Sequence, residues 1–590
     1  MASLSSISLS TSSSETSILR SIYRNLSVLQ TVVVRTFPSQ TMKKSRTQIN
    51  YVAYVQPHDV NRPRSSIRCT SFNVDGTGST TSLDEEVKID TSGIKLPLPL
   101  FETQSFSSDA PTDDSASLSI AVIGATGVLA RTKIFPALFA LYYSGQLPEK
   151  FGIFGYSRKK LTEEDLRAVI EPTLSCRIDH QENCEEAMDA FLKRTFYLYG
   201  GYDNREGMSK LNILMEEVEG KFGANRIFYL SVPQEAVIDV ASSLGEKAQT
   251  PRGWNRVIIE KPFGLGSFSS HQLTASLLSN FEEKQLYRID HLLGRNTIEN
   301  LAVLRFSNLV FMPLWNRSYI HNIQVTFSEE LGMQTSARYP NGYGILGDVV
   351  HSHIFQTVAL LAMEPPVTLD GEDVRYEKVK VLKSIRKLGS SDVILGHCEV
   401  DFGSNFKDVE NLMPTYFGAV LHIDNARWDG VPFLIKAGRG LKKNRVEIRI
   451  QFRRVPGNIY HKDRGHMQDL ATNELILRDV PDEAILVRIN NKIPGLGMNL
   501  EASELNLLYK DKYNVDVTDS YEQLLHDVID GDNHLFMRSD EVEAAWNILS
   551  PVLSELDNNN VTLEHYEFGS KGPDKVGNLW AKHGIKWLDD

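Results

Sequence analysis

The sequence predicts an α/β protein whose folded part opens with a parallel sheet. Residues 118–124 form an apolar run typical of a buried strand, a turn with two glycines follows, and residues 134–143 have helical spacing. A strand, a glycine turn and a helix form the phosphate-binding corner of a Rossmann unit. We therefore predict a dinucleotide-binding domain that begins near Leu118.

The glycine turn supplies the first candidate ligand contacts. Gly124 permits a tight turn, and Gly127 lets backbone N–H groups approach a diphosphate at the positive end of the helix. Ala130 is small enough for close packing of the helix on the strand. Taken alone the pattern is of moderate specificity, because many loops contain two glycines.

Further strands are expected over residues 151–156, 226–233 and 257–264. Arg158 follows the first of them, where an NAD-specific fold places a carboxylate for the ribose hydroxyls. An arginine there instead suits the 2′-phosphate of NADP. The alternative is an ordinary solvated arginine.

Composition excludes several classes of function. The chain has 590 residues, of which 41% are hydrophobic and 23% charged, as in ordinary globular proteins. Its net charge of −12 argues against a nucleic-acid partner. We find no apolar run of about 18 residues, so no membrane span is predicted.

The first 70 residues have the composition of a targeting segment. They contain 15 Ser and nine Lys or Arg but only two acidic residues. Ile67-Arg68-Cys69 resembles a plastid processing site, so we predict a plastid transit peptide over 1–69 and a stromal location. A merely disordered tail is the alternative. Residues 70–117 lack periodic apolar positions and are expected to be a flexible lead-in.

Four segments resemble one enzyme family. Residues 287–295 (Tyr-Arg-Ile-Asp-His-Leu-Leu-Gly-Arg) resemble the substrate signature of glucose-6-phosphate dehydrogenases, and segments 260–264, 428–433 and 473–478 resemble further family segments in the same order. The resemblance implies a Rossmann NADP-binding domain, here 118–290, and a β+α substrate and dimerisation domain with a large, mostly antiparallel sheet, here 291–590. The alternating residues 445–452 fit such a sheet.

The resemblance also implies chemistry. The family oxidises the C1 hydroxyl of glucose 6-phosphate to a lactone while reducing NADP, at the entry to the oxidative pentose phosphate pathway. His353 matches the base, which suits a side chain whose pKa is near neutral, and Asp290 matches the carboxylate that orients it. The implied substrate contacts are Lys261, His291, Arg295, Glu329, Asp348 and Arg439. The implied cofactor contacts are Gly124, Gly127, Lys133, Arg158, Pro233 and Lys261.

Several residues depart from the family pattern. Leu292 replaces a tyrosine of the signature, and Arg295 and Arg439 each replace a lysine. The resemblance places these three residues in the region of the substrate phosphate, for which His291 is the implied ligand. The other departures are Val128, Thr132, Gly347, Asn444 and residues 335–338. One lost charge-assisted hydrogen bond costs about 1.5–3 kcal/mol, so several together can remove useful turnover. Two readings stay open: a working dehydrogenase, or a non-catalytic regulatory or assembly subunit of active relatives, as a homodimer or heterodimer.

Two ligand sites are considered beside the active site. A metal held by His351 and His353 is disfavoured, because residues two apart on a helix face opposite ways. Five basic residues match, or replace with like charge, the surroundings of a structural NADP site found in some family members; ordinary charged sheet edges are the alternative. They are Arg445, Arg449, Arg478, Arg488 and Lys571.

Cys176 and Cys184 are two of four cysteines in the chain. Spacing alone favours free thiols. The segment that contains them, however, looks like the regulatory cysteine pair of plastid-type family members, which thioredoxin reduces. The resemblance therefore implies a redox-active disulfide and thioredoxin as a partner.

Overall fold

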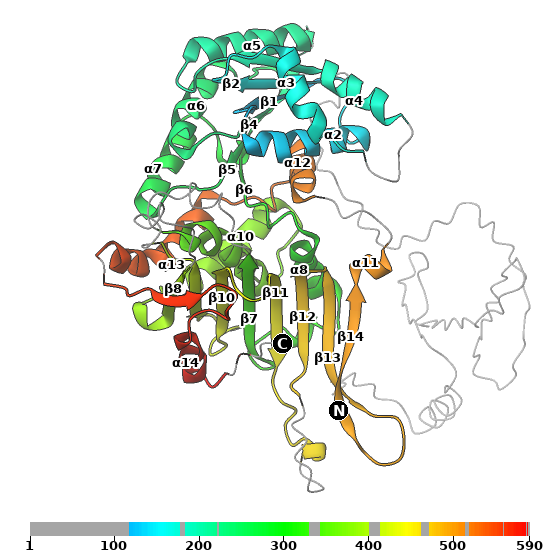
Figure 1. Cartoon of the computed structure of the whole chain (residues 1–590), viewed down its shortest axis with the longest axis vertical. Helices are drawn as coiled ribbons and strands as arrows, with labels where there is room; N and C mark the ends of the chain where they lie inside the picture. Colours follow the sequence, from blue (N-terminus) through cyan, green and yellow to red (C-terminus); the bar gives the residue numbers. More distant parts are fainter. Residues whose placement is uncertain are drawn as a thin grey trace, which may run out of the picture. The chain divides into compact units, whose positions relative to one another are not determined.

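The computed structural model describes residues 117–176, 183–220, 223–329, 343–399, 413–461, 471–513, 519–558, 560–585 and 587 (Figure 1). The predicted transit peptide at 1–69, the lead-in up to residue 116 and the divergent segment 335–338 lie outside the described residues. The first described strand begins at Ser117, one residue before the predicted start of the folded part.

The first sheet has six parallel strands in the order β3-β2-β1-β4-β5-β6. In chain order they are β1 (Ser117–Ile123), β2 (Phe151–Ser157), β3 (Thr195–Tyr199), β4 (Ala224–Leu230), β5 (Asn255–Glu260) and β6 (Leu286–Ile289). Every residue of β2 is buried, as expected for a parallel strand covered on both faces. This is the strand order of a Rossmann fold, and it confirms the predicted fold class.

Helices connect and cover these strands. They are α2 (Phe135–Tyr143), α3 (Glu163–Ile170), α4 (Cys184–Lys193), α5 (Arg205–Glu219), α6 (Gln234–Lys247) and α7 (Ser267–Leu278). The helix after the glycine turn starts earlier than predicted, with a π-helical turn, η1 (Ala130–Ile134). Its residues 131–133 are polar, so apolar spacing shows the helix only from Ile134 onward.

The second sheet has nine strands in the order β14-β13-β12-β11-β7-β10-β9-β8-β15. They are β7 (Ile320–Glu329), β8 (Val393–Glu399), β9 (Tyr416–Leu421), β10 (Phe433–Arg439), β11 (Arg445–Phe452), β12 (Glu474–Val480), β13 (Ala484–Lys492), β14 (Leu500–Leu508) and β15 (Glu564–Glu567). Only the pairs β7–β10 and β8–β15 are parallel. The expected large, mostly antiparallel sheet is therefore confirmed, and β11 matches the alternating segment 445–452.

Further helices follow β6 in the chain, and most of them lie beside this sheet (Figure 1). They are α8 (Asn296–Ser307), η8 (Leu346–Ile354), α9 (Phe355–Ala362), α10 (Gly371–Ser384), α11 (Tyr509–Lys512), α12 (Ser520–Asp530), α13 (Ser539–Asp557) and α14 (Lys575–Lys582). Short 3-10 turns are η2 (Glu171–Thr173), η5 (Glu283–Gln285), η6 (Met312–Leu314), η9 (Ser390–Asp392) and η11 (Ile459–His461). Every residue of η8 and α9 is buried, so this helix forms the core between α10, α13 and the sheet.

Two features position the site. The predicted domain boundary at 290/291 falls in the loop between β6 and α8, and η8 contacts β10 of the second sheet. Helix α12 packs against α2, the helix that follows the glycine turn.

Within the described part of the chain, no helix is both long and apolar enough to cross a bilayer.

Candidate active site

The centre of the candidate site is a buried pair of side chains, Asp290 and His353. Asp290 directly follows β6, and His353 lies near the end of η8; both are at most 1% exposed. The Nδ1 atom of His353 forms an ion pair with Oδ1 of Asp290. Burial alone raises the pKa of Asp290, but the charge and hydrogen bond of His353 hold that pKa well below its usual range. The carboxylate therefore stays ionised and fixes the imidazole with its proton on Nδ1.

Lys261 contacts the other nitrogen of the imidazole. It follows β5, and its Nζ lies 2.7 Å from Nε2 of His353 and 2.9 Å from the carbonyl oxygen of Asp348. Because the ammonium only donates, Nε2 is the acceptor, and its lone pair is the one that a general base uses. Both nitrogens of His353 are thus engaged by neighbouring side chains.

Three predicted substrate contacts converge next to this base. Asp348 lies in η8, Arg439 ends β10, and Glu329 ends β7. Nη2 of Arg439 forms an ion pair with Oδ2 of Asp348, and its Nε lies 4.0 Å from Oε2 of Glu329. Oδ1 of Asp348 also lies 3.4 Å from Nζ of Lys261. The carboxylate expected to bind a sugar hydroxyl is therefore shared between two internal cations.

His291 lies beside the base, its ring 4.8 Å from that of His353 in an edge-to-face contact. On its other side it stacks on Tyr521 of α12, 6.2 Å away. Burial, together with the electrostatic effects of His353 and of the Lys261 ammonium, lowers the pKa of His291 well below its usual value. His291 is therefore neutral at physiological pH.

Three side chains of this site are of the types that can bind a metal ion. Asp290, His291 and His353 offer ligand atoms within 4.8 Å of one another. However, the ion pair with Asp290 and the contact with Lys261 engage both nitrogens of His353. His351 is not part of this group, because its ring stacks on Trp546, 4.0 Å away. The arrangement suits proton transfer better than metal binding.

Two departures from the family pattern lie at the start of α8. Leu292 is 3% exposed and lines a cavity of about 20 Å³ together with His353 and Asp479. Its backbone N–H donates to Oδ1 of Asp290 at 3.1 Å. Arg295 is the N-cap residue of α8, and its guanidinium forms an ion pair with Asp479 at the end of β12. A predicted phosphate contact is thus already paired with a carboxylate.

The predicted cofactor residues gather at the carboxyl ends of the parallel strands. Gly124 follows β1 with φ +91°, and a Cβ there would lie 2.0 Å from the carbonyl oxygen of Ser231. Pro233, the N-cap of α6, follows β4. The strand order reverses between β1 and β4, which is where such sheets bind dinucleotides. Gly127 is a second position of the turn without a side chain, which fits the close approach of a diphosphate to the backbone.

Arg158 and Lys133 have different surroundings. Arg158 is exposed at the end of β2, with its guanidinium 4.5 Å from the ring centre of Tyr202. A cation held at this strand end fits the 2′-phosphate of NADP. Lys133 instead forms an ion pair at 2.7 Å with Asp519, just before α12. The structure therefore does not place its ammonium against Lys261 and His353.

Sequence reasoning missed three residues of this region: Asp479, Tyr521 and Tyr202. Each contacts a predicted site residue from a distant segment, for example Asp479, which is 184 positions from Arg295. No local pattern marks them. An acidic residue after an alternating strand, or a tyrosine at a helix start, has no distinctive spacing.

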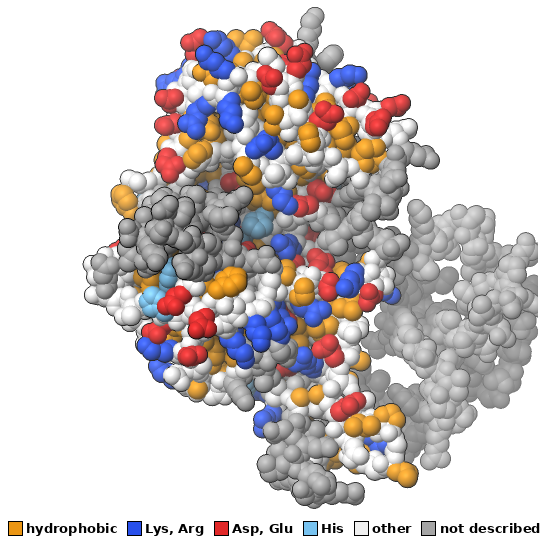
Figure 2. Space-filling model, viewed as in Figure 1, with side chains coloured by type: hydrophobic (Ala, Val, Ile, Leu, Met, Phe, Trp, Pro, Cys, Tyr) orange, Lys and Arg blue, Asp and Glu red, His pale blue; other side chains and the backbone are white. Residues whose placement is uncertain are grey.

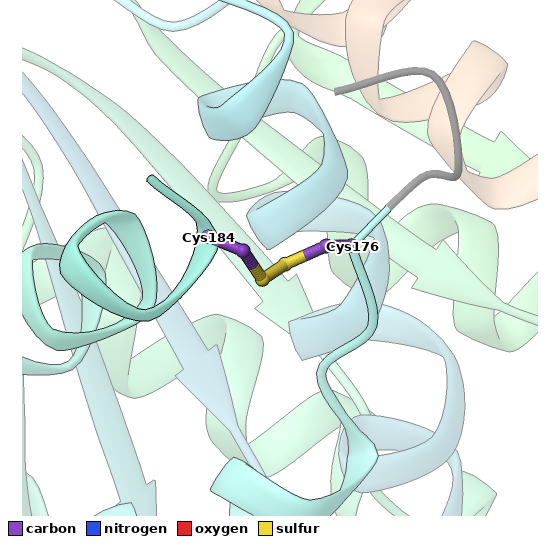
Figure 3. Close-up of a disulfide and its surroundings, with 2 residues drawn as sticks. All are labelled: Cys176 and Cys184. Atoms are coloured by element: carbon purple, nitrogen blue, oxygen red, sulfur yellow. A yellow bond between two sulfur atoms is a disulfide. The ribbon is translucent and has the colours of Figure 1, made fainter. Parts of the chain in front are cut away.

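The predicted disulfide is present between Cys176 and Cys184, with Cα atoms 6.1 Å apart (Figure 3). Cys184 is the first residue of α4, which contacts α2 after the glycine turn. Residues 177–182 between the cysteines lie outside the described residues. The bond therefore anchors a segment next to the predicted cofactor corner. Its reduction by thioredoxin stays a prediction.

Three of the five residues predicted around a second NADP site line one pocket of about 300 Å³: Arg445, Arg449 and Lys571. Lys and Arg side chains gather on this face of the second sheet (Figure 2). The remaining two lie on neighbouring strands: Arg478 donates to the carbonyl oxygen of Asp482, and Arg488 forms an ion pair with Glu504. A second NADP site stays a prediction.

The two parts of the chain that contain the two sheets each match a known family model. Residues 121–300 match the family model of the glucose-6-phosphate dehydrogenase NAD binding domain, and residues 302–588 match that of the C-terminal domain. The chain is 66% identical over 480 residues to the inactive glucose-6-phosphate 1-dehydrogenase 4, chloroplastic, of Arabidopsis thaliana, covering 80% of this chain and 76% of that protein.

Other relatives are not named as inactive. The chain is 51% identical to the chloroplastic glucose-6-phosphate 1-dehydrogenase of Solanum tuberosum, covering 80% of this chain and 84% of that protein. A solved structure of glucose-6-phosphate dehydrogenase in complex with its substrate glucose-6-phosphate matches with a TM-score of 0.74 and 37% identity, covering 80% of this chain and 99% of that one.

Proposed function

The chain belongs to the glucose-6-phosphate dehydrogenase family, and from this premise we propose that it is an NADP-dependent oxidoreductase of glucose 6-phosphate with weak turnover. The observation that carries the proposal is the contact of His353 with Asp290 on one ring nitrogen and with Lys261 on the other. It joins a base in η8, the group that orients it after β6 and a cation after β5.

The chain's residues have distinct roles in this proposal. Nε2 of His353 takes the proton of the C1 hydroxyl, and the buried carboxylate of Asp290 stabilises the imidazolium that forms. Lys261, 2.7 Å from Nε2, is placed to donate a hydrogen bond to the C1 oxygen. The cofactor that this site would take is NADP, which supplies an acceptor for the hydride of C1. Gly124 and Gly127 would hold its diphosphate, and Arg158 its 2′-phosphate.

The same geometry explains why turnover should be weak. Asp348 must bind a sugar hydroxyl while it is already shared between Lys261 and Arg439. Leu292 offers no hydroxyl group, and Arg295 is paired with Asp479. Each substrate contact therefore replaces an existing ion pair or is missing, which raises KM.

A second candidate function is a non-catalytic subunit that dimerises with active relatives. The ion pair between Arg439 and Asp348, which occupies the sugar contact, favours it, and so does the relative at 66% identity, which is named as an inactive dehydrogenase. Under either function we propose a location in the plastid stroma, in line with the chloroplastic relatives, and thioredoxin as reductant of the Cys176–Cys184 bond.

One set of measurements tests both functions. The purified mature chain is incubated with NADP and a range of glucose 6-phosphate concentrations while NADPH absorbance is followed. We expect a high KM and low rate, improved when Leu292→Tyr and Arg295→Lys are combined. Ordinary family kinetics in the wild type would contradict the weak-turnover proposal. No turnover in any variant, with heterodimer formed by an active plastid relative in ultracentrifugation, would support the second function.

A further inference from the structure

The ion pair of Arg295 with Asp479 has an asymmetric environment. The carboxylate of Asp479 is 4% exposed and belongs to β12, which is hydrogen-bonded on both sides, to β11 and β13. The side chain of Arg295 is 37% exposed at the start of α8. The anion is therefore held by the sheet, whereas the cation is the partner that solvent and ligands can reach.

A second carboxylate lies close by. Glu483 accepts a hydrogen bond at 3.5 Å from Nδ2 of Asn296, the residue after Arg295, and the charge of Asp479 raises the pKa of Glu483 in addition to the larger effect of burial. Arg295 thus faces two acidic groups. The local charge around its guanidinium is neutral to negative.

The remaining groups that the family resemblance assigns to the substrate phosphate do not compensate for the neutralised charge of Arg295. His291 is neutral, because burial and nearby cations lower its pKa. Leu292 is an apolar side chain in place of a phenol. Arg439, which the resemblance also places near the phosphate, is paired with Asp348. A phosphate group carries close to two negative charges at neutral pH, so it needs more cationic partners than these residues supply.

We propose that Asp479 is a specificity-determining residue: by pairing with Arg295 it withdraws the positive charge that would bind the phosphate of glucose 6-phosphate. The inference rests on the proposed function and names what limits its substrate affinity. The consequence is a substrate site that distinguishes poorly between a sugar phosphate and the uncharged sugar. If Arg295 binds a phosphate instead, Asp479 remains a buried carboxylate without its cation. This loss of the ion pair opposes phosphate binding.

The test is Asp479→Asn, which keeps size and removes the charge. Asp482→Asn is the matched control: it removes a carboxylate three residues further along the chain that pairs with Lys510 at 3.0 Å instead of with Arg295. Full-length mature protein, with NADP bound, is titrated calorimetrically with glucose 6-phosphate and with glucose. Initial rates with both sugars are measured in parallel.

We expect Asp479→Asn to tighten binding of glucose 6-phosphate about tenfold and lower its KM, with glucose affinity and kcat unchanged. Asp482→Asn should leave the affinity ratio of the two sugars as in the wild type. In an Arg295→Gln background the effect of Asp479→Asn should disappear. Equal changes for both sugars, or the same gain with Asp482→Asn or without Arg295, would overturn the assignment.

The ratio of the affinities for glucose 6-phosphate and for glucose keeps this test separate from the test of the proposed function. If no variant turns over, the oxidoreductase proposal fails, but the two calorimetric affinities still report whether Asp479 controls phosphate binding. If turnover is present and the affinity ratio does not respond to Asp479→Asn, the oxidoreductase proposal stands and the role of Asp479 is refuted. Equal thermal melting temperatures of Asp479→Asn and wild type confirm that the variant is folded.

Discussion

Arg158→Ala isolates the group proposed to select NADP. The guanidinium lies at the end of β2, 4.5 Å from the ring centre of Tyr202, and is exposed to solvent. The aromatic ring orients the cation before the cofactor arrives, so little side-chain entropy is lost on binding. We expect the variant to bind NADP more weakly than the wild type and NAD almost unchanged.

The expected size of the loss in NADP affinity follows from the exposure of Arg158. A charge-assisted hydrogen bond is worth about 1.5–3 kcal/mol, and an exposed pair belongs at the lower end because water and salt screen it. At about 1.4 kcal/mol for each factor of ten, roughly 1.5–2 kcal/mol corresponds to a 10- to 30-fold loss of NADP affinity. The preference for NADP over NAD should shrink by the same factor.

Isothermal titration calorimetry of the mature chain with NADP and with NAD measures this change without any need for turnover. Lys160→Ala is the matched control, because Lys160 is exposed two residues later and lies 5.5 Å from the ring of Tyr199. Equal affinities of the wild type for the two cofactors would refute the reasoning. Parallel losses for NADP and NAD in Arg158→Ala would refute it as well.

Three further predictions concern stability and redox state. Glu541→Gln removes the partner of the fully buried Lys378, 3.0 Å away, and should cost about 3–5 kcal/mol, seen as a lower Tm that Lys378→Met largely restores. Burial raises the pKa of Asp527 to about 7, so the stability from its protonated form is lost as pH rises from about 4 through 7. Asp527→Asn should therefore make Tm fall less between pH 5 and pH 8; an unchanged pH profile would contradict this. Reduced thioredoxin should release two titratable thiols from the mature chain but not from Cys176→Ser, and a bond that resists thioredoxin would exclude a redox switch.

The strands of the first sheet could be predicted because burial on both faces demands continuous apolar runs. Residues 118–124 and 151–156 are such runs, and both form strands of the parallel sheet. The turn at Gly124 was equally readable, since its positive φ and its close approach to Ser231 exclude a side chain. The second sheet was expected from family resemblance, because antiparallel strands of mixed burial leave a weaker periodic pattern.

The sequence by itself determined the family, through segments that resemble it, and the parallel sheet, through its buried apolar runs; the site residues are predictions that the resemblance implies. Only the tertiary structure decided which charges meet. Lys133 pairs with Asp519, Arg295 with Asp479, and Arg439 with Asp348. Each pair joins elements that are distant in the chain, and its formation depends on how helices and strands pack. A charge that local spacing marks as a ligand contact can therefore be neutralised by a partner that only packing brings to it.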